Sequence, residues 1–187
     1  MGSLDTRGGE DIIIVGNNFG IPSTSWYGCP RTRNVAAPML SVIYASQIPM
    51  DSTGAAILNE IEYNAEECVV VVKHTQIRCK SVPGVGHSHH YKVIFSDSSS
   101  SEWSVNSTNY SEPVVLKVSG PGMSQATSTG GQEVYFDGDF FGPANLQSGL
   151  YILASYGVYP DAWVETSLHY PPYSADCMVS LSNVRLV

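Results

Sequence analysis

Two stretches of this sequence match each other although most of the chain separates them. Residues 8–20 read GGEDIIIVGNNFG, and residues 130–142 read GGQEVYFDGDFFG. Their glycines and one phenylalanine coincide at a constant spacing of 122 positions, with Gly8, Gly9, Gly16, Phe19 and Gly20 against Gly130, Gly131, Gly138, Phe141 and Gly142. Self-similarity at a fixed spacing marks a repeated structural unit. We therefore expect the 187 residues to form two small domains of one kind.

Short apolar, β-branched runs bounded by turn residues dominate the chain, a pattern typical of strands. The runs are DIIIVG, PMLSVIYAS, CVVVVKH, TQIRCKS, YKVIFSD, PVVLKVSG, EVYFDG, LYILAS, WVETSLHY and DCMVSLSNVRLV. Residues 53–68, TGAAILNEIEYNAEEC, are the best helical candidate, and a long loop followed by a strand is the alternative. Many short strands with few helices predict an all-β fold built of sandwiches.

The repeated glycines have two interpretations. A phosphate-binding loop needs its glycines between a strand and a helix, so that helix N–H groups face the anion. Here GNNFG is followed by IPSTSWYGCPRTRN, which has two prolines and no helical period. The structural interpretation is favoured: Gly16 ends a strand, Asn17-Asn18 forms a turn, and Phe19 packs against the edge of the core.

The pattern Gly-Gly, apolar run, Gly-x-x-Phe-Gly resembles the start of the IPT/TIG repeat, an immunoglobulin-like domain. Further motifs follow in the order of that family: the apolar run after Cys68, TQIRC ending at Cys79, KSVPGVG at 80–86 and YKVIF at 91–95. In the second half, PVVLKVSGPGMSQATSTGG at 113–131 resembles the family's opening strand. The resemblance covers nearly the whole chain and implies two tandem immunoglobulin-like β-sandwiches.

The expected domains span residues 1–111 and 112–187. The Ser-rich stretch 96–113 is predicted to be a loop or frayed hairpin that buries little. The first domain has 13 more residues than the second between its Phe-Gly motif and its cysteine, which places an insertion in residues 21–67. Against the family pattern, we expect the first sandwich to lack its opening strand and the second to lack its closing hairpin. Such open edges favour pairing with neighbouring repeats or protein partners.

The four cysteines suggest one bridge. Cys68 and Cys79 lie in two strand-like runs that a hairpin would bring opposite each other, so a disulfide is favoured over two buried free thiols. Cys29 and Cys177 could pair with each other, pair elsewhere or stay free. The chain has no C-x-x-C motif, which disfavours a structural zinc site.

Histidines and acidic residues give weaker candidates. The HSHH motif contains His87, His89 and His90, which could bind a metal but fall on an expected turn, so solvated turn histidines are favoured. Asp137 and Asp139 lack the further oxygen ligands of an EF-type calcium loop. No nucleophile or cofactor motif occurs. We therefore expect no metal, no cofactor and no enzymatic activity.

Several residues are candidates for surface roles. Asn106 and Asn109 head two glycosylation sequons, NST and NYS, in the exposed Ser-rich stretch. Trp26, Tyr27 and Trp163 fall in expected loops, where aromatic side chains can stack on sugars or anchor a protein partner. Partial burial at the ends of the sandwiches is the favoured interpretation for these aromatics.

Composition narrows the function. The net charge of -8 argues against nucleic-acid binding and against docking on an anionic membrane. No apolar run is long enough to span a bilayer, and no signal peptide is visible. Cysteines and sequons favour the secretory route. We expect a non-catalytic structural or adhesion module of a cell-surface or secreted multi-repeat protein or extracellular filament, and the alternative is a carbohydrate-binding accessory module.

Overall fold

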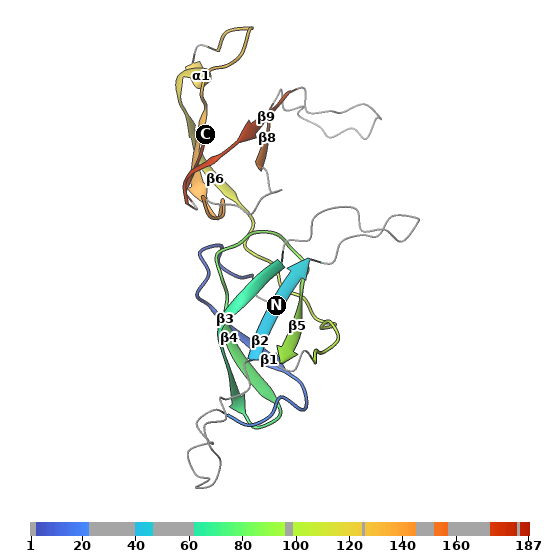
Figure 1. The fold of residues 1–187 in the computed structure, drawn as a ribbon. Coiled ribbons are helices and arrows are strands. Elements are labelled where there is room, and N and C mark those ends of the chain that lie inside the picture. Colours follow the sequence, from blue (N-terminus) through green and yellow to red (C-terminus); the bar gives the residue numbers. More distant parts are fainter. Residues whose placement is uncertain are drawn as a thin grey trace, which may run out of the picture. The chain divides into compact units, whose positions relative to one another are not determined.

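The computed structural model describes residues 3–22, 40–46, 62–95, 99–124, 126–144, 152–156, 173–182 and 184–187. The chain divides into two compact units, unit 1 (Met1–Glu112) and unit 2 (Pro113–Val187), one residue beyond the expected boundary (Figure 1). The only helix in the described part is the single turn α1 (Pro121–Ser124), and nothing there is long and apolar enough to cross a membrane as a helix. The prediction of an all-β fold is confirmed.

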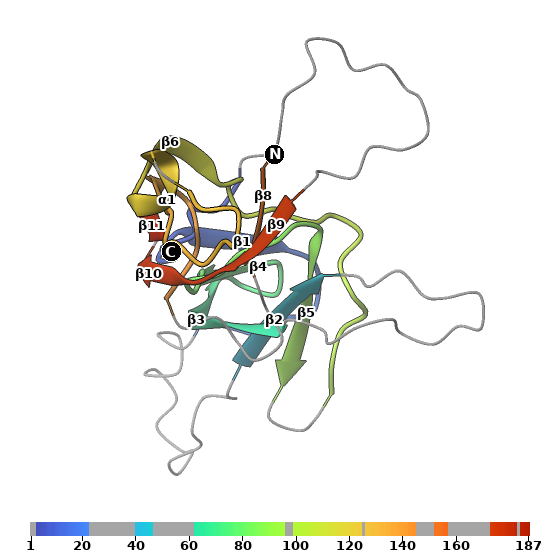
Figure 2. The same cartoon turned by 90° about the horizontal axis from the view of Figure 1, so that it is seen from above.

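The described residues of unit 1 form five strands whose hydrogen-bonded order is β1-β4-β3-β2-β5, with every pair antiparallel. They are β1 (Asp11–Val15), β2 (Leu40–Ser46), β3 (Glu62–Val72), β4 (Gln76–Lys80) and β5 (His89–Phe95). Figure 2 shows β2 and β5 side by side. Of the two alternatives for residues 53–68, the strand is confirmed and the helix is wrong for residues 62–68, because these residues belong to β3, which pairs with β2 and β4. The remainder of that segment lies outside the described residues.

The long strand β3 serves two partners in succession. Its first residues pair with β2, as in Tyr44 opposite Tyr63, and its later residues pair with β4, as in Val70 opposite Ile77. The ladder with β4 shifts register between Glu66 and Val69. Such a bulge bends a strand and increases its twist. The bend lets β3 join a β1-β4 ladder to a β2-β5 ladder.

Residues from both ladders form one core in unit 1. Inward positions alternate with exposed ones, so that β4 shows the burial expected of a strand with one face in a core. The buried members of the core are Leu4, Ile12, Val42, Tyr44, Tyr63, Ile77, Cys79, Tyr91, Val93 and Tyr110. β3, which connects the two ladders, contributes the buried Tyr63 near its first residue and the partly buried Val70 near its last residue.

The Ser-rich stretch does more than the sequence predicts. Residues 99–110 lie along β5, with an isolated bridge from Ile94 to Ser100 and another from His89 to Thr108. Tyr110 at its end is only 3% exposed, and a parallel bridge joins it to Leu4. The expectation that this stretch buries little is wrong at Tyr110. The backbone bridge between Tyr110 and Leu4 places the tyrosine side chain in the core.

Unit 2 contains a four-stranded sheet and a separate two-stranded one. The first has the order β10-β11-β7-β6 and the second pairs β8 with β9. The strands are β6 (Val114–Ser119), β7 (Tyr135–Asp139), β8 (Ile152–Tyr156), β9 (Tyr173–Cys177), β10 (Val179–Leu181) and β11 (Arg185–Leu186). The core cluster is small, with Phe141, Val179 and Leu186 buried and Phe136, Ile152 and Cys177 packed against them.

The backbone turns repeat between the units. Gly9 and Gly131 both have φ of 85°, Gly20 and Gly142 both have φ of 87°, and Asn18 and Phe140 both have φ of 64°. Gly16 and Gly138 share a further role. A Cβ on Gly16 would lie 2.5 Å from the ring of Phe19, and a Cβ on Gly138 would lie 2.8 Å from the ring of Phe141. The glycines therefore serve turns and the close approach of a phenylalanine, as the structural interpretation predicts.

The strand registers repeat as well. Ile14 opposite Ile77 in unit 1 corresponds to Phe136 opposite Leu186 in unit 2. The Gly16 N–H donates to the Thr75 carbonyl at 3.0 Å, as the Gly138 N–H does to the Val184 carbonyl at 2.9 Å. β10 matches the end of β3, and β11 matches the start of β4. The β10-β11 ladder and the β3-β4 ladder also share a register shift at the same place. The two units are thus copies of one strand arrangement in this region.

Gly8 and Gly9 give a matched test of the turn that enters β1. Both have positive φ, but a Cβ on Gly8 would lie 2.5 Å from the backbone carbon of Val82, whereas a Cβ on Gly9 meets nothing within 4 Å. We expect Gly9→Ala to cost about 1 kcal/mol of unfolding free energy from backbone strain. Gly8→Ala should cost about 2–4 kcal/mol, because the clash adds overpacking.

Urea denaturation of unit 1 within the full chain measures both free energies. Equal losses for the two variants would contradict the close packing of this turn against residues 82–83.

Candidate interaction site

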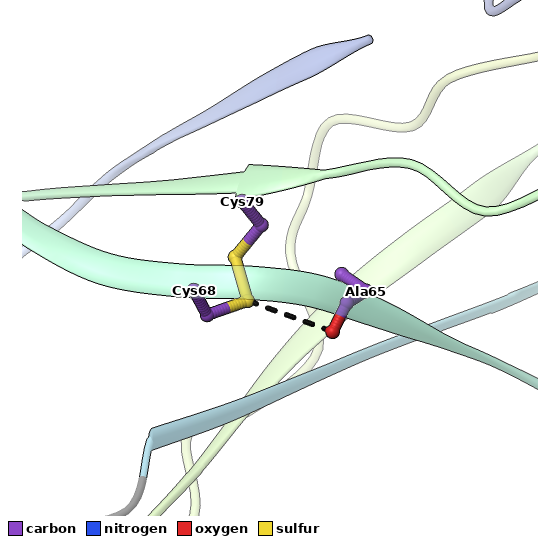
Figure 3. Close-up of a disulfide and its surroundings, with 3 residues drawn as sticks. All are labelled: Ala65, Cys68 and Cys79. Atoms are coloured by element: carbon purple, nitrogen blue, oxygen red, sulfur yellow. Dashed lines mark hydrogen bonds between the residues drawn. A yellow bond between two sulfur atoms is a disulfide. The ribbon is translucent and has the colours of Figure 1, made fainter. Parts of the chain in front are cut away.

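A disulfide joins the two ladder strands at the bend of β3. Cys68 on β3 and Cys79 on β4 have an S–S distance of 2.08 Å and a Cα–Cα distance of 4.1 Å (Figure 3). Cys79 is 1% exposed, and Cys68 packs against the core from a partly buried position. The Cys68 sulfur also lies 3.8 Å from the Ala65 carbonyl oxygen. Because an oxidised sulfur carries no proton, this contact is packing and the bridge itself fixes the bulge.

The other two cysteines differ from this pair. Cys177 is a free, half-buried thiol at the end of β9, and burial raises its pKa. It occupies the place in unit 2 that Cys68 occupies in unit 1. Cys29 lies outside the described residues.

Four tyrosines and one histidine form an aromatic group in unit 1, which we call the tyrosine cluster: Tyr44, Tyr63, Tyr91, Tyr110 and His89. Tyr44 stacks on Tyr63 and Tyr91 with ring centroids 5.2 Å and 5.4 Å apart. The His89 ring meets three of the tyrosines edge to face at 5.4–5.9 Å. Edge-to-face pairs are favourable because the positive edge of one ring meets the negative face of another.

The tyrosine hydroxyls bind the backbone of the loop after β4. Tyr110 donates to the Val82 carbonyl at 2.6 Å, and Tyr44 accepts from the Val82 N–H at 3.1 Å. Tyr63 exchanges two hydrogen bonds with Val85, at 3.0 Å and 3.1 Å. The Tyr44 and Tyr110 hydroxyls lie 2.6 Å apart, which lets Tyr44 donate to Tyr110. Burial raises the pKa of all three, so they stay neutral donors and acceptors.

His89 is a structural residue inside this cluster. Its side chain is 0% exposed, and Nε2 donates to the Val85 carbonyl at 3.2 Å. Burial lowers its pKa, since a charged imidazolium would lose its hydration there. The interpretation as a solvated turn histidine is wrong for His89, because β5 begins at this residue and turns the ring inward.

The neighbouring histidines have partners of their own. His87 Nδ1 lies 3.2 Å from the Ser88 hydroxyl, and His90 Nδ1 lies 2.6 Å from the Ser104 carbonyl. The HSHH motif therefore directs its rings to three different places. Across the part of the chain that the structure describes, no group of three or more His, Cys, Asp or Glu side chains could hold a metal ion.

Both sequon asparagines are exposed on the segment that follows β5. Asn109 accepts a hydrogen bond from the Ser88 N–H through Oδ1 at 2.8 Å, which leaves its amide nitrogen, the atom that carries a glycan, outside this contact. Thr108, the hydroxyl residue of the first sequon, is hydrogen-bonded to Tyr91 at 2.6 Å. The acceptor residues thus lie on a defined surface of unit 1.

The remaining sequence candidates divide into two groups. Trp26, Tyr27 and Trp163 lie outside the described residues, so their role as ligand contacts stays a prediction. Asp137 and Asp139 belong to β7, and Asp137 accepts a hydrogen bond from Arg185 Nε at 2.6 Å. Arg185 thereby lowers the pKa of Asp137 and uses its carboxylate in an ion pair.

The sequence predicts open strand edges. Among the described residues of unit 1, β1 stands at one end of the strand order and has such an edge. β1 pairs with β4 and stands last, whereas its counterpart β7 lies between β11 and β6. The side chains of Ile13 and Val15 on β1 are 49% and 77% exposed.

The disulfide should stabilise unit 1. We expect the double variant Cys68→Ala/Cys79→Ala to lose about 2–3 kcal/mol of unfolding free energy, because the bridge restricts the unfolded chain over a short loop. Urea denaturation of the full chain measures the loss, with Cys177→Ala as the control for a free thiol. A double variant as stable as the control would show that the bridge contributes nothing.

His89 should make unit 1 sensitive to acid. The folded unit holds His89 neutral, while the unfolded chain binds a proton below about pH 6.5. Stability should therefore be complete above that pH and fall below it, by up to about 1.4 kcal/mol per pH unit until the lower folded pKa is reached.

Denaturation midpoints between about pH 5 and about pH 8 test this slope. His89→Gln should flatten it, whereas His74→Asn, which removes an exposed imidazole at a residue with positive φ, should retain it. A slope that survives His89→Gln would assign the acid sensitivity elsewhere.

Comparison of the chain with protein-family models, with curated proteins and with solved structures finds no match. The resemblance to IPT/TIG repeats therefore stays a prediction that rests on the chain's own motifs.

Proposed function

We propose that this chain belongs to a non-catalytic cell-surface or secreted protein, built of tandem IPT/TIG-like immunoglobulin sandwiches, that mediates protein–protein contacts. The observation that carries the proposal is the repeated geometry of the two units. Turn dihedrals and strand registers recur from β1 and β4 to β7 and β11. Repetition of one sandwich-type unit is a common way to build surface proteins that space their loops and edges at fixed intervals.

Two features support an extracellular place. The Cys68–Cys79 bridge is a bond that persists in oxidising compartments and is rare in the cytosol. Asn106 and Asn109 are exposed on one segment, as glycan acceptors must be. The acidic net charge of -8 suits a soluble surface more than a nucleic-acid or membrane-docking one.

The proposed mechanism is geometric. The disulfide and the tyrosine cluster cross-link the strands of unit 1, which gives the edge of β1 a fixed place toward a partner. Preorganisation of this kind lowers the entropy cost of binding. The partner is proposed to be protein, because an open edge offers backbone hydrogen-bond groups that an extended peptide can satisfy.

A cell-binding experiment tests this function. The full chain, made through a secretory host and coupled to a tetrameric carrier, is applied to intact cells that have been treated with protease or with glycosidase. We expect binding that protease abolishes and glycosidase spares, since a protein surface is the proposed ligand.

Loss of binding after glycosidase, with competition by free sugars, would favour the carbohydrate-binding alternative. Absence of binding to any cell or matrix surface tried would contradict an adhesive role. A tetramer of the destabilised double variant Cys68→Ala/Cys79→Ala serves as the control that tests whether binding needs a correctly folded unit 1.

A further inference from the structure

The backbone of β1 offers hydrogen-bond groups on the side away from β4. The Ser81 N–H donates to the Glu10 carbonyl at 2.9 Å, and the Gly16 N–H donates to the Thr75 carbonyl at 3.0 Å. In an antiparallel ladder, alternate residues face alternate neighbours. The even positions from 10 to 16 therefore face β4. The N–H and C=O groups of Ile13 and Val15 face outward, where the described residues supply β1 with no second strand.

Unit 2 shows what such an edge binds. Tyr135 and Asp137 are the counterparts of Ile13 and Val15, and they pair with β6 through Ser119 and Lys117. The opposite side of β7 pairs with β11 in the same register in which β1 pairs with β4. Because the copies agree on the β4 side, the outward side of β1 presents the geometry that β7 presents to β6.

Within the described residues, the β1 strand carries neither lysine nor proline, and its ladder with β4 has no bulge. Natural edges carry Lys, Pro, a bulge or a cover that prevents pairing. β1 is Asp-Ile-Ile-Ile-Val, whose β-branched residues favour strand pairing, and Val15 is 77% exposed. An unprotected edge of this composition is suited to receive another strand.

We propose that the outward edge of β1 is a strand-addition site for an extended polypeptide segment with the pattern of residues 113–119, Pro-Val-Val-Leu-Lys-Val-Ser, which include β6, bound antiparallel. The register follows from unit 2: the lysine of the incoming strand lies opposite Val15 and its serine lies opposite Ile13. The internal pairing of β6 with β7 identifies the occupant, and the acidic net charge of -8 favours a strand that carries lysine. The inference rests on the proposed function, since it names the kind of protein segment that the module binds.

The register gives a test in which two substitutions at one site act in opposite directions. In unit 2, Lys117 lies opposite Asp137 and, after Arg185, contributes to the low pKa of that carboxylate. Val15→Asp would recreate this opposite-charge pair with the incoming lysine, whereas Val15→Lys would place like charges across the strands. Opposite charges across strands stabilise pairing and like charges destabilise it. We expect the affinity of the two variants to differ by about tenfold.

The probe is a synthetic peptide with the sequence EPVVLKVSG, residues 112–120, added to the full chain. Titration calorimetry gives the affinity, and amide hydrogen exchange gives the place of binding. We expect slowed exchange at Ile13 and Val15, tighter binding by Val15→Asp and weaker binding by Val15→Lys. A peptide in which the lysine is replaced by glutamate should reverse the order of the two variants.

Ile13→Pro is a second variant, because the Ile13 N–H faces outward and its removal leaves the bonds to β4 intact. It should abolish binding of the peptide, while Ile13→Thr, which keeps the N–H, should not. If Ile13→Pro fails to fold, the reversal between the charge variants at Val15 still decides the question.

Three results would overturn the proposal: no binding, binding with equal affinity by both Val15 variants, or protection only at β7. Concentration-dependent self-association that Ile13→Pro abolishes without added peptide would also overturn it, and would make a second copy of the chain the occupant. Failure of peptide binding with cell binding intact would overturn this inference alone. Loss of cell binding with peptide binding intact would overturn the adhesive function and leave the edge site standing.

Discussion

Hydrogen bonds from three buried tyrosine hydroxyls hold unit 1 together at the point where its ladders meet. The loop after β4 has to pass over the core, and its backbone groups at Val82 and Val85 lose water there. Tyr44, Tyr63 and Tyr110 replace that water, each from a different part of the chain. Val82 and Val85 are half-buried, and leaving a buried polar group without a partner costs about 1–3 kcal/mol, so these bonds favour the closed position of the loop. Among the described residues no buried side-chain nitrogen or oxygen lacks a partner.

The tyrosine cluster and the disulfide fix β3 at two different places along its length. The bridge fixes β3 to β4 at the bulge, and Tyr63 fixes the start of β3 to the loop that leaves β4. β3 can therefore bend between two ladders without sliding. A strand with a half-polar, irregular sequence such as Glu62–Glu67 specifies register weakly by itself. The covalent link and the tyrosine bonds supply the register that its side-chain pattern lacks.

The sequence predicts the repeated parts and the Cys68–Cys79 bridge correctly, but it does not predict the tyrosine cluster. The entrance to β1, the turn after it and the phenylalanine that packs there are local features, and the chain contains them twice, so each copy supports the other. The tyrosine cluster depends on contacts between residues far apart, such as Tyr44 and Tyr110, which are 66 positions apart. Local composition also concealed two of its members. Tyr63 lies in residues 53–68, the best helical candidate of the sequence. Tyr110 lies near the end of the Ser-rich stretch 96–113.

The histidine motif shows the same limit. Its polar composition and position before YKVIF predict a solvated turn, yet strand β5 begins at His89 and alternation sends that ring inward. Nothing within the motif distinguishes the buried ring from its neighbours. The distinguishing fact is the set of tyrosines that arrive from other strands, which only the folded arrangement brings together.

Comparison of the two copies also separates what the fold needs from what one unit adds. Ile14–Ile77 and Phe136–Leu186 keep an apolar pair in the core, which the packing of either unit requires. On the outer face the same register places Val15 beside Gln76 in unit 1 but the Asp137–Arg185 ion pair in unit 2. Val15 is 77% exposed, so neither it nor the ion pair of unit 2 contributes to the packing of a core. Since the inner faces are equivalent, this difference between the two outer faces cannot come from the demands of the core.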